Sequence, residues 1–452
     1  MRRLSFLWYT QRDMKVHFLG IGGIGVSALA QYYLADGQEV SGCDLAPSEL
    51  TTALSRKGAV VRTGEPEPSC VPEDTDLLIY SPAISAEHPE RVTAREKGIL
   101  EFSYPEALGD LTRTHYTIAV SGTHGKSTTT AMIALVLLHG GLDPTVIVGT
   151  KLKEFGNSNF RIGKNGCLKN GKPFLVIEAD EHTASFLHYW PDVIVLTYLE
   201  ADHMDYYKTL ENLQETFKEY LTHLPVEGQL VANGDDTGVK SVLPQGRTTH
   251  LYALESPEAK EIRNILQVPG EHNVSNALAA FHVGRLLGIE KERILEALSS
   301  FKGSWRRFEV FELAEPVSYT LVSDYGHHPT EVKVTVEAAR AKWPNRPLWL
   351  VFQPHQYHRT FTFFEQFVKV LSGLPANRIL LTPIYGVPGR EDASVKERVS
   401  SEKLAKAVSK AQYVPTLSGA QELLQKELTG GEVVIVMGAG DIYELTLRLC
   451  SG

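Results

Sequence analysis

The sequence predicts an α/β protein built from several domains, each with a mainly parallel sheet. Short runs rich in Val, Ile and Leu, bounded by Gly, Pro or Asp, alternate with longer segments of helical periodicity. This alternation is typical of buried parallel strands and the helices that cover them. The pattern restarts at Val16, at Tyr116 and near Val317. Because a domain usually holds about 100–200 residues, the 452 residues accommodate three such units, with boundaries that we place near residues 113 and 308.

The strands are predicted from their apolar composition and from the turn residues that bound them. In chain order they are Val16–Leu19, Glu39–Cys43, Leu77–Tyr80, Tyr116–Val120, Phe174–Ile177, Val193–Thr197, Val317–Ser323, Leu348–Phe352, Arg378–Thr382 and Val433–Met437. A helix that covers a sheet is predicted between Thr360 and Leu374. Its apolar residues recur at helical spacing and are Phe364, Phe367, Val368 and Leu371.

Composition and charge exclude several classes of protein. The hydrophobic share is 43%, the charged share 22% and the net charge −9, which are values of an ordinary globular protein and argue against a nucleic-acid-binding surface. Four scattered cysteines without a C-x-x-C pair argue against a disulfide framework and a zinc ribbon. No apolar run approaches the roughly 20 residues that span a bilayer. We therefore expect a cytoplasmic protein with a short extension (residues 1–13) and no nucleic-acid or membrane partner.

A glycine-rich loop follows the first predicted strand and reads Gly20-Ile21-Gly22-Gly23-Ile24-Gly25. Glycines at such positions allow a tight turn and the close approach of a phosphate, and the helix that follows presents its positive N-terminus. Asp44 closes the next predicted strand, where an acidic side chain commonly accepts ribose hydroxyls. The loop predicts nucleotide or phosphate binding. The motif does not say which nucleotide, and a tight turn without a ligand is the alternative.

A second loop, Ser121-Gly122-Thr123-His124-Gly125-Lys126-Ser127, follows the strand Tyr116–Val120. It is a shortened P-loop, because Val120 stands where the full pattern has a glycine. Backbone N–H groups of such a loop surround phosphates, the lysine neutralises their charge, and the serine hydroxyl ligates Mg²⁺. We predict that this loop, with the apolar helix that follows it to Leu138, binds ATP.

Acidic strings follow two further predicted strands and read Glu178-Ala179-Asp180-Glu181 and Glu200-Ala201-Asp202-His203-Met204-Asp205. Carboxylates at the carboxyl ends of parallel strands beside a phosphate loop can hold the metal ions of phosphoryl transfer. Mg²⁺ prefers oxygen ligands, so His203 is an unusual ligand and a structural histidine is the alternative. Acidic runs are also commonly just solvated, and only their place beside the predicted ATP site favours a metal.

Two strings lie between the central strands and the last domain. Gly270-Glu271-His272-Asn273-Val274-Ser275-Asn276-Ala277 leads into a predicted helix, Ala277–Leu287, so its two asparagines are either helix caps or ligand contacts. Ser304-Trp305-Arg306-Arg307-Phe308 lies at the predicted domain junction, where an arginine would either reach phosphates or form a surface salt bridge.

Three strings in the last domain follow strands, at positions where doubly wound sheets bind ligands. They are Asp324–Pro329, Gln353–Thr360 and Met437–Asp441. Histidines cluster in the first two, but their spacing matches no H-E-x-x-H or H-x-x-E-H motif. We therefore do not predict zinc at these histidines.

Taken in order, these strings resemble those of the Mur ligases of peptidoglycan synthesis. The resemblance rests on the glycine loop, S-G-T-H-G-K-S-T-T-T, E-A-D-E, E-A-D-H-M-D, G-E-H-N-V-S-N-A-L-A-A, R-R-F, D-Y-G-H-H-P-T-E-V and F-Q-P-H, and covers residues 14 to about 445. It implies a three-domain Mur ligase architecture of α/β class. Its parts would be a Rossmann-like UDP-sugar-binding domain (1–113), a P-loop ATPase-like central domain (114–308) and a Rossmann-like amino-acid-binding domain (309–452).

The resemblance also implies a reaction. A Mur ligase activates a muramyl carboxylate with ATP as an acyl phosphate, which an incoming amine then attacks. The strings Gly20–Gly25 and Asp324–Val332 point to the member that joins L-alanine to UDP-N-acetylmuramate and releases ADP and phosphate. ATP and two Mg²⁺ ions are the implied cofactors, and a monomer or weak homodimer is the expected assembly.

The same resemblance assigns roles to individual residues. The implied catalytic residues are Lys126, Glu178, His203, Arg307 and Asp324. ATP would contact Gly122, Thr123, His124, Gly125, Lys126, Ser127, Thr128, Asn273, Asn276, Arg307 (with Arg306 as a further candidate) and Asp324. The metal ligands would be Ser127, Glu178 and His203. The UDP-sugar would contact Gly20, Gly22, Gly23, Ile24, Gly25, Asp44 and Ser81, and the amino acid would contact Tyr325, His327, His355, Gln356 and Arg359.

Two positions depart from the family's pattern. Gln356 stands where the family string F-Q-P-H-R-Y has an arginine. Arg359 would then hold the amino-acid carboxylate alone, and the choice among alanine, glycine and serine stays open. Tyr198 stands where relatives have asparagine. Three rival functions also remain, namely a ligase that attaches a preformed tripeptide to the same sugar, a nicotinamide oxidoreductase and an inactive Mur-like scaffold.

Overall fold

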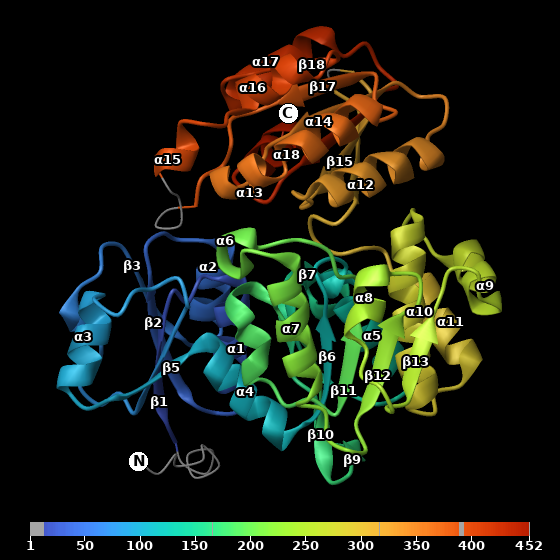
Figure 1. The fold of residues 1–452 in the computed structure, drawn as a ribbon. Coiled ribbons are helices and arrows are strands. Elements are labelled where there is room, and N and C mark those ends of the chain that lie inside the picture. Colours follow the sequence, from blue (N-terminus) through green and yellow to red (C-terminus); the bar gives the residue numbers. More distant parts are fainter. Residues whose placement is uncertain (1–12, 165, 316, 388–392, 452) are drawn as a thin grey trace. The chain divides into compact units, whose positions relative to one another are not determined.

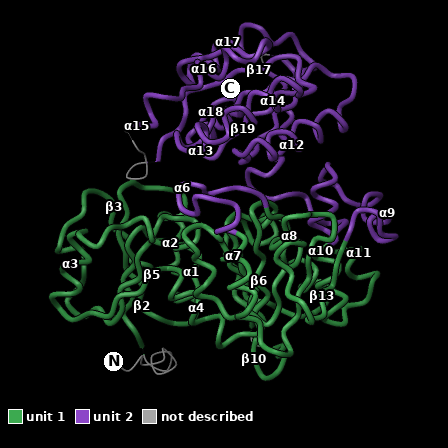
Figure 2. Tube along the Cα trace, viewed as in Figure 1, with its two compact units in different colours: residues 1–199, 214–252, 279–297 green, residues 200–213, 253–278, 298–452 purple. Residues whose placement is uncertain are grey.

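The computed structural model of the chain describes residues 13–164, 166–315, 317–387 and 393–451. Residues 1–12 of the predicted N-terminal extension therefore lie outside the described residues. The chain forms two compact units, which Figure 2 distinguishes by colour. Unit 1 comprises residues 1–199, 214–252 and 279–297, and unit 2 comprises residues 200–213, 253–278 and 298–452.

The first sheet of unit 1 has five parallel strands in the order β3-β2-β1-β4-β5 (Figure 1). These strands are β1 (Lys15–Leu19), β2 (Glu39–Asp44), β3 (Val60–Thr63), β4 (Leu77–Tyr80) and β5 (Leu100–Ser103). The helices of this region are α1 (Ile24–Ala35), α2 (Glu49–Arg56), η2 (Pro68–Cys70), α3 (Pro89–Glu96) and α4 (Tyr104–Thr114). The strand order reverses between β1 and β4, and the glycine loop follows β1 at this point, where such sheets bind ligands.

The second sheet of unit 1 has the order β13-β12-β11-β6-β10-β7-β8, with β9 paired to β10. It is parallel except that β8 runs antiparallel to β7 and β9 antiparallel to β10. The strands are β6 (Tyr116–Ser121), β7 (Thr145–Leu152), β8 (Ser158–Arg161), β9 (Leu168–Lys169), β10 (Lys172–Glu178), β11 (Val193–Leu196), β12 (Gln229–Asn233) and β13 (Thr249–Tyr252). Because β6 lies between β10 and β11, the P-loop and both acidic strings follow neighbouring strands.

The helices of this central region include α5 (Lys126–His139), which is buried along most of its length. The others are η3 (Lys153–Phe155), η4 (His182–His188), α6 (Met204–Tyr207), α7 (Leu210–Leu221), α8 (Thr237–Val242), α9 (Pro257–Ile265), α10 (Glu271–Leu286) and α11 (Lys291–Ser300). A helix that is apolar nearly all round must be enclosed on all sides, so α5 is fixed in place. The P-loop at its N-terminus is fixed with it.

Polar contacts join helix α1 to strand β8 of the second sheet. Asn159 on β8 donates from Nδ2 to Ser27 Oγ at 2.9 Å and accepts at Oδ1 from Gln31 Nε2 at 2.9 Å. All three side chains are buried. Because a buried polar group without a partner is costly, such a fully matched set specifies one arrangement. Helix α1, which begins just after the glycine loop, is thereby held against the second sheet.

The sheet of unit 2 has six strands in the order β14-β15-β19-β16-β17-β18, and only β14 is antiparallel to its neighbour. The strands are β14 (Glu309–Leu313), β15 (Tyr319–Asp324), β16 (Leu348–Phe352), β17 (Arg378–Leu381), β18 (Ala411–Tyr413) and β19 (Val433–Met437). Residues of α12 (Pro329–Lys342), α14 (Phe364–Gly373) and α16 (Ser401–Ala407) pack on one face, and residues of α17 (Leu417–Glu427) and α18 (Tyr443–Cys450) pack on the other. Two short helices, α13 (Tyr357–Thr362) and α15 (Ala393–Lys396), complete the unit.

The strand predictions are confirmed, since every predicted strand is present in one of the three sheets. The predicted sheet-covering helix is α14, and its Phe367 and Leu371 are buried. The predicted helix start at Ala277 is wrong, because α10 already begins at Glu271. Two asparagines and a histidine in this stretch lowered its apparent helix propensity, and tertiary packing overrides that weak preference. The domain boundaries near residues 113 and 308 stay a prediction.

In the part of the chain that the structure describes, no helix combines the length and the apolar character needed to cross a membrane.

Candidate active site

The P-loop is shaped by two glycines with left-handed backbone conformations. Gly122 has φ 133° and Gly125, which precedes α5, has φ 81°. A Cβ atom at Gly122 would collide with Thr197 Oγ1 and would lie 2.8 Å from Tyr198 N, so only glycine fits there. Thr123 N donates to Tyr198 O at 2.8 Å, and this bond ties the loop to the chain after β11. Tyr198 therefore contributes its backbone to the shape of the loop.

Lys126 stands at the first residue of α5 and forms a buried ion pair. Its Nζ donates to both oxygens of Glu181, at 2.8 and 2.9 Å, and to Gly122 O at 2.8 Å. The Glu181 side chain is fully buried. Burial disfavours the charged lysine, but the carboxylates of Glu181 and Asp180 outweigh it and raise the pKa of Lys126. The lysine is thus held charged and in one position at the mouth of the P-loop.

Ser127 and Glu178 place two oxygen ligands beside this lysine. Ser127 Oγ donates to Glu178 Oε2 at 3.1 Å, and Gly149 N donates to the other carboxylate oxygen. Ser127 lies in the first turn of α5 and Glu178 ends β10. A hydroxyl and a carboxylate at the N-terminus of a helix are oxygen donors of the kind that Mg²⁺ prefers. The third predicted ligand, His203, belongs to unit 2, and its joining this pair stays a prediction.

The glycine loop and its predicted partners gather at the carboxyl ends of β1, β2 and β4. Gly22 N donates to Asp44 Oδ2 at 2.8 Å, and Gly20 N and Ile21 N both donate to Cys43 O, at 2.9 and 3.1 Å. Ser81, which follows β4, donates from its backbone N to Leu19 O at 3.0 Å. Asp44 therefore stabilises the loop itself, in addition to any contact with a ribose.

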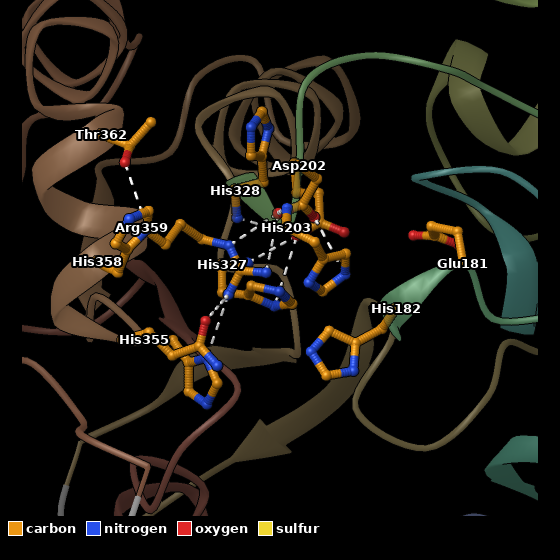
Figure 3. A network of polar contacts seen from close by, with 12 residues as sticks. Glu181, His182, Asp202, His203, His327, His328, His355, His358, Arg359 and Thr362 are labelled. Carbon is orange, nitrogen blue, oxygen red and sulfur yellow. Dashed lines mark hydrogen bonds and ion pairs between the residues drawn. The ribbon is translucent and has the colours of Figure 1, made fainter. Parts of the chain in front are cut away.

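In unit 2, Asp202 and Arg359 form a second buried ion pair. Arg359 donates to Asp202 Oδ1 from Nε at 3.1 Å and from Nη2 at 2.9 Å, and both side chains are only 5% exposed. Burial works against the charged carboxyl of Asp202, but the Arg359 guanidinium holds its pKa well below the usual range. Figure 3 shows Asp202 and His327 beside the guanidinium end of Arg359.

Four further side chains surround Arg359 and complete what we call the arginine–histidine cluster, formed by Asp202, Tyr325, His327, His355, Gln356 and Arg359. Arg359 Nη1 lies 3.4 Å from His355 Nδ1 and donates to Gln356 Oε1 at 3.2 Å. The His327 ring lies 5.4 Å from the His355 ring and 5.6 Å from the Tyr325 ring, centroid to centroid. The structure thus brings together all five residues predicted to contact the amino acid.

The two histidines of this cluster are neutral at pH 7. Burial, with the nearby Arg359 charge, lowers the pKa of His327 to about 4. Burial, with the His327 and Arg359 charges, lowers the pKa of His355 to about 2. Neutral imidazoles can donate or accept a hydrogen bond without adding charge. The cluster therefore has one cation, Arg359, with two of its nitrogens already bound to Asp202.

Asp324 is the last residue of β15, and its carboxylate accepts hydrogen bonds from two nearby backbone N–H groups. Its Oδ2 accepts from Phe308 N at 2.9 Å and its Oδ1 accepts from Gly326 N at 2.8 Å. Burial raises the pKa of this carboxyl to about 6, and the Arg307 charge opposes that shift. Each carboxylate oxygen retains a second lone pair, so a role in ribose binding is compatible with these contacts.

The two candidate arginines differ in burial, since Arg307 is partly exposed and Arg306 is buried. Arg306 is buried and donates from Nη2 to the carbonyl oxygens of Gly438 and Gly440, at 2.5 and 3.3 Å. Its Nη2 group is thus used inside unit 2, and a contact between Arg306 and a phosphate stays a prediction. Arg307 stacks 4.9 Å over the Tyr325 ring and remains partly exposed.

Asn273 and Asn276 lie within the first turns of α10 and do not cap it. Asn273 Nδ2 donates to Pro269 O at 2.7 Å, and Asn276 Nδ2 lies 3.4 Å from Asn273 Oδ1. Both are buried. The cap interpretation is wrong because α10 begins at Glu271, and the adenine contact stays a prediction.

Two functional residues lie outside the predicted site set. Glu181 holds Lys126, and Asp202 holds Arg359. Both stood in acidic strings that the sequence singled out, but their basic partners are distant along the chain. Because a buried cation needs a buried anion, Lys126 and Arg359 each require an acidic partner. This requirement points to the two acidic strings as the source of the partners, but it does not identify Glu181 and Asp202 within them.

Comparison with known proteins agrees with this geometry. The chain matches the families described as "Mur ligase family, catalytic domain" over residues 15–116, "Mur ligase middle domain" over residues 120–284 and "Mur ligase, glutamate ligase domain" over residues 306–440. A UDP-N-acetylmuramate–L-alanine ligase of Acetivibrio thermocellus is 36% identical, and the match covers 98% of this chain and 97% of that protein.

Two solved structures share the fold. The UDP-N-acetylmuramate-alanine ligase of Thermotoga maritima has a TM-score of 0.79 at 28% identity, over 97% of this chain and 98% of that one. A murein peptide ligase of Psychrobacter arcticus has a TM-score of 0.71 at 22% identity, over the same shares of the two chains. Because its sequence identity is below 25%, the second structure supports a shared fold but not a shared function.

Proposed function

The chain belongs to the Mur ligase family, and on that premise we propose that it joins L-alanine to the carboxylate of UDP-N-acetylmuramate with consumption of ATP. The observation that carries this proposal is the placement of Lys126, Ser127 and Glu178 at one P-loop. Relatives described as UDP-N-acetylmuramate–L-alanine ligases match this chain over 97–98% of its length. The reaction would supply a precursor of peptidoglycan, and we propose that it takes place in the cytoplasm, with the enzyme a monomer or weak homodimer.

In the proposed reaction, an oxygen of the sugar carboxylate attacks the γ-phosphorus of ATP, and the bond to ADP breaks. The amine of L-alanine then attacks the carbonyl carbon of the acyl phosphate, loses a proton, and inorganic phosphate leaves. No covalent bond to the enzyme is needed, so positioning and charge stabilisation account for the catalysis.

Lys126 would stabilise the negative charge of the phosphates. Its pairing with Glu181 supports this role, because the carboxylate keeps the ammonium charged and fixed before ATP arrives. Preorganised charge stabilises a transition state without reorganisation at the moment of reaction. The backbone N–H groups from Gly122 to Thr128 would contact the phosphates, as in other P-loops.

Two Mg²⁺ ions are part of the proposal. Ser127 and Glu178 would hold one, and His203 would contribute to the other; bound Mg²⁺ neutralises charge on the transferring phosphoryl group. The oxygen donors of Ser127 and Glu178 fit this ion, while the imidazole of His203 fits it less well.

The arginine–histidine cluster would bind L-alanine. Arg359, oriented by Asp202, would direct Nη1 towards the carboxylate of the amino acid. With Gln356 in place of a second arginine, one charge-assisted contact is available here, and such contacts are roughly twice as strong as neutral ones. The cluster therefore supports weak binding of a small amino acid, with alanine, glycine and serine as candidates.

The remaining roles follow the same logic. Arg307 would contact a phosphate, Asp324 the ATP ribose, and Asn273 and Asn276 the adenine. The glycine loop Gly20–Gly25, with Asp44 and Ser81, would hold the UDP-sugar at the switch point between β1 and β4.

A phosphate-release assay tests the proposal. Release should require UDP-N-acetylmuramate, ATP, Mg²⁺ and L-alanine together, and leaving out any one should abolish it. Release that proceeds equally well without the sugar nucleotide would overturn the proposal. If a preformed tripeptide outcompetes L-alanine, the chain is instead a ligase that attaches such a peptide to the same sugar.

A further inference from the structure

A buried polar cluster lies under the first sheet of unit 1, and none of its side chains has a role in the site described above. His17 on β1, Cys43 on β2 and Glu90 on α3 each direct one ligand-type atom towards the others, and these atoms all lie within 4.8 Å of one another. His17 and Glu90 are each only 1% exposed. Buried polar groups of this kind need a reason to be there, since an apolar core is the cheaper alternative.

The parallel register of β1 and β2 explains how the cluster forms. His17 pairs with Ser41, and Leu19 pairs with Cys43. Because side chains alternate along a strand, Ser41 and Cys43 point to the same face as His17. Ser41 Oγ lies 2.8 Å from His17 Nδ1, and Cys43 Sγ lies 3.7 Å from His17 Nε2. The two ring nitrogens are therefore used by different partners.

The two separations that involve His17 Nε2 match those of a tetrahedral zinc site. His17 Nε2 lies 3.3 Å from Glu90 Oε2 and 3.7 Å from Cys43 Sγ. Around a tetrahedral Zn²⁺ with ordinary bond lengths, nitrogen and oxygen ligands are about 3.3 Å apart and nitrogen and sulfur ligands about 3.5 Å apart. Cys70 of η2 interacts with Cys43 through its side chain, which makes it the candidate for a fourth ligand.

The surroundings of the cluster suit a metal as well. The Ser41 hydroxyl fixes the His17 ring from the opposite nitrogen, as second partners of zinc-bound histidines commonly do. Next to the cluster, the face continues as an apolar core of Leu19, Val71, Leu78 and Ala94. Cys43 and Cys70 are only partly buried, so an ion could enter from their side.

We propose that His17, Cys43 and Glu90, with Cys70 as the fourth ligand, form a structural site for a zinc-type divalent cation. The ion would displace the protons of the Cys43 and Cys70 thiols to solvent, and the site with neutral His17 and ionised Glu90 would keep one net negative charge. Binding of the ion would also affect the glycine loop. Cys43 O accepts the N–H groups of Gly20 and Ile21, so fixing Cys43 at a metal also fixes the glycine loop. The site is separate from the Mg²⁺ site proposed at Ser127 and Glu178.

Metal analysis of the untagged full-length chain tests this proposal. After expression with zinc and dialysis, the wild-type chain should hold about one zinc ion, and Cys43→Ser should hold almost none. Glu178→Gln and the exposed Cys450→Ser should keep the zinc, which separates this site from the catalytic one and from thiols in general.

Cobalt provides a second readout that reports the ligands directly. The chain reconstituted with Co²⁺ should show a thiolate-to-metal charge-transfer band in the near ultraviolet, and Cys43→Ser should lose or sharply weaken it. Cys70→Ser should shift the band and weaken metal retention. A chelator should lower the melting temperature of the wild-type chain but not that of Cys43→Ser.

Three results would overturn the proposal. The first is a wild-type chain that holds no zinc and shows no cobalt band. The second is a Cys43→Ser variant with undiminished zinc. The third is a disulfide between Cys43 and Cys70, seen as an intact mass lower by two hydrogen atoms and as joined peptides in a peptide map. Each is independent of whether the chain ligates L-alanine.

Discussion

The P-loop of unit 1 and the arginine–histidine cluster of unit 2 each hold a buried cation against a buried carboxylate, but they are built differently. The P-loop is one contiguous turn between β6 and α5, and its shape follows from Gly122 and Gly125. The cluster joins Asp202 to residues of the segments 325–327 and 355–359. Backbone shape can be encoded locally, whereas a side-chain cluster exists only once distant segments meet. We therefore expect variants to affect chemistry most at the first region and amino-acid binding and stability at the second.

The largest effect should come from Lys126→Met. Loss of the ammonium from the P-loop should reduce phosphate release by about 10³-fold, the range seen when one preorganised charge contact to a transition state is lost. The double variant Lys126→Met with Glu181→Gln removes the unpaired carboxylate and should recover stability without recovering turnover. Steady-state kinetics with thermal melting separates the two effects.

Lys218→Ala on the exposed face of α7 is the matched control and should retain wild-type turnover. Retained turnover in Lys126→Met would contradict the role assigned to the P-loop.

The next effect concerns stability in unit 2. Arg359→Met leaves the Asp202 carboxylate buried without its partner, which typically lowers the free energy of unfolding by about 3–5 kcal/mol. Adding Asp202→Asn should restore much of this loss, while the KM for L-alanine stays high in both variants. Urea unfolding and amino-acid titrations provide the two measurements. If single and double variants are equally unstable, the ion pair does not organise the cluster.

The pH dependence of stability should show a smaller effect of the same cluster. The folded pKa of His327 is lowered to about 4, against about 6.5 for an unperturbed histidine. Below pH 6.5 the unfolded chain binds a proton that the folded chain does not. Stability is therefore fully present above pH 6.5 and falls as the pH drops towards 4, by at most about 3 kcal/mol.

His327→Gln removes this titration, so its free energy of unfolding should fall less steeply between pH 6.5 and 4 than that of the wild-type chain. Urea unfolding at several pH values measures the slope. Burial and the Arg359 charge lower the pKa of His327, Glu331 and Asp202 oppose that shift, and all three charged groups are unchanged in this variant. Identical slopes would show that His327 is protonated as readily in the folded chain as in the unfolded one.

The smallest expected effect is a gain at Gln356. Gln356→Arg adds a second charged donor beside Arg359 Nη1, and a stronger contact to the amino-acid carboxylate should lower the KM for L-alanine by up to about tenfold. The KM for ATP should not change. The exposed Gln366→Arg on α14 serves as the control for added charge. A KM for L-alanine that rises in Gln356→Arg alone would indicate repulsion between the two arginines.

The two regions also differ in how far the sequence predicted them. Strands were found because buried parallel strands are apolar throughout, and the P-loop was found because its glycines and lysine stand in a fixed local order. The start of α10 was missed because packing overrides the weak helix preference of Asn273 and its neighbours. Glu181 and Asp202 were recognised only as members of acidic strings, since their partners are far away in the chain.

By itself, the sequence determined the α/β class, the strands, the two loops at strand ends and, through resemblance, the family. Only the tertiary structure decided that Glu181 pairs with Lys126 and that Asp202 pairs with Arg359. It also decided that Arg306 points inward and that His17, Cys43 and Glu90 meet beneath the first sheet. The physical reason is the distance along the chain between the residues that interact. Backbone conformation and strand burial depend on neighbouring residues, whereas the partner of a buried charge or thiol is set by which distant segments the packed core brings together.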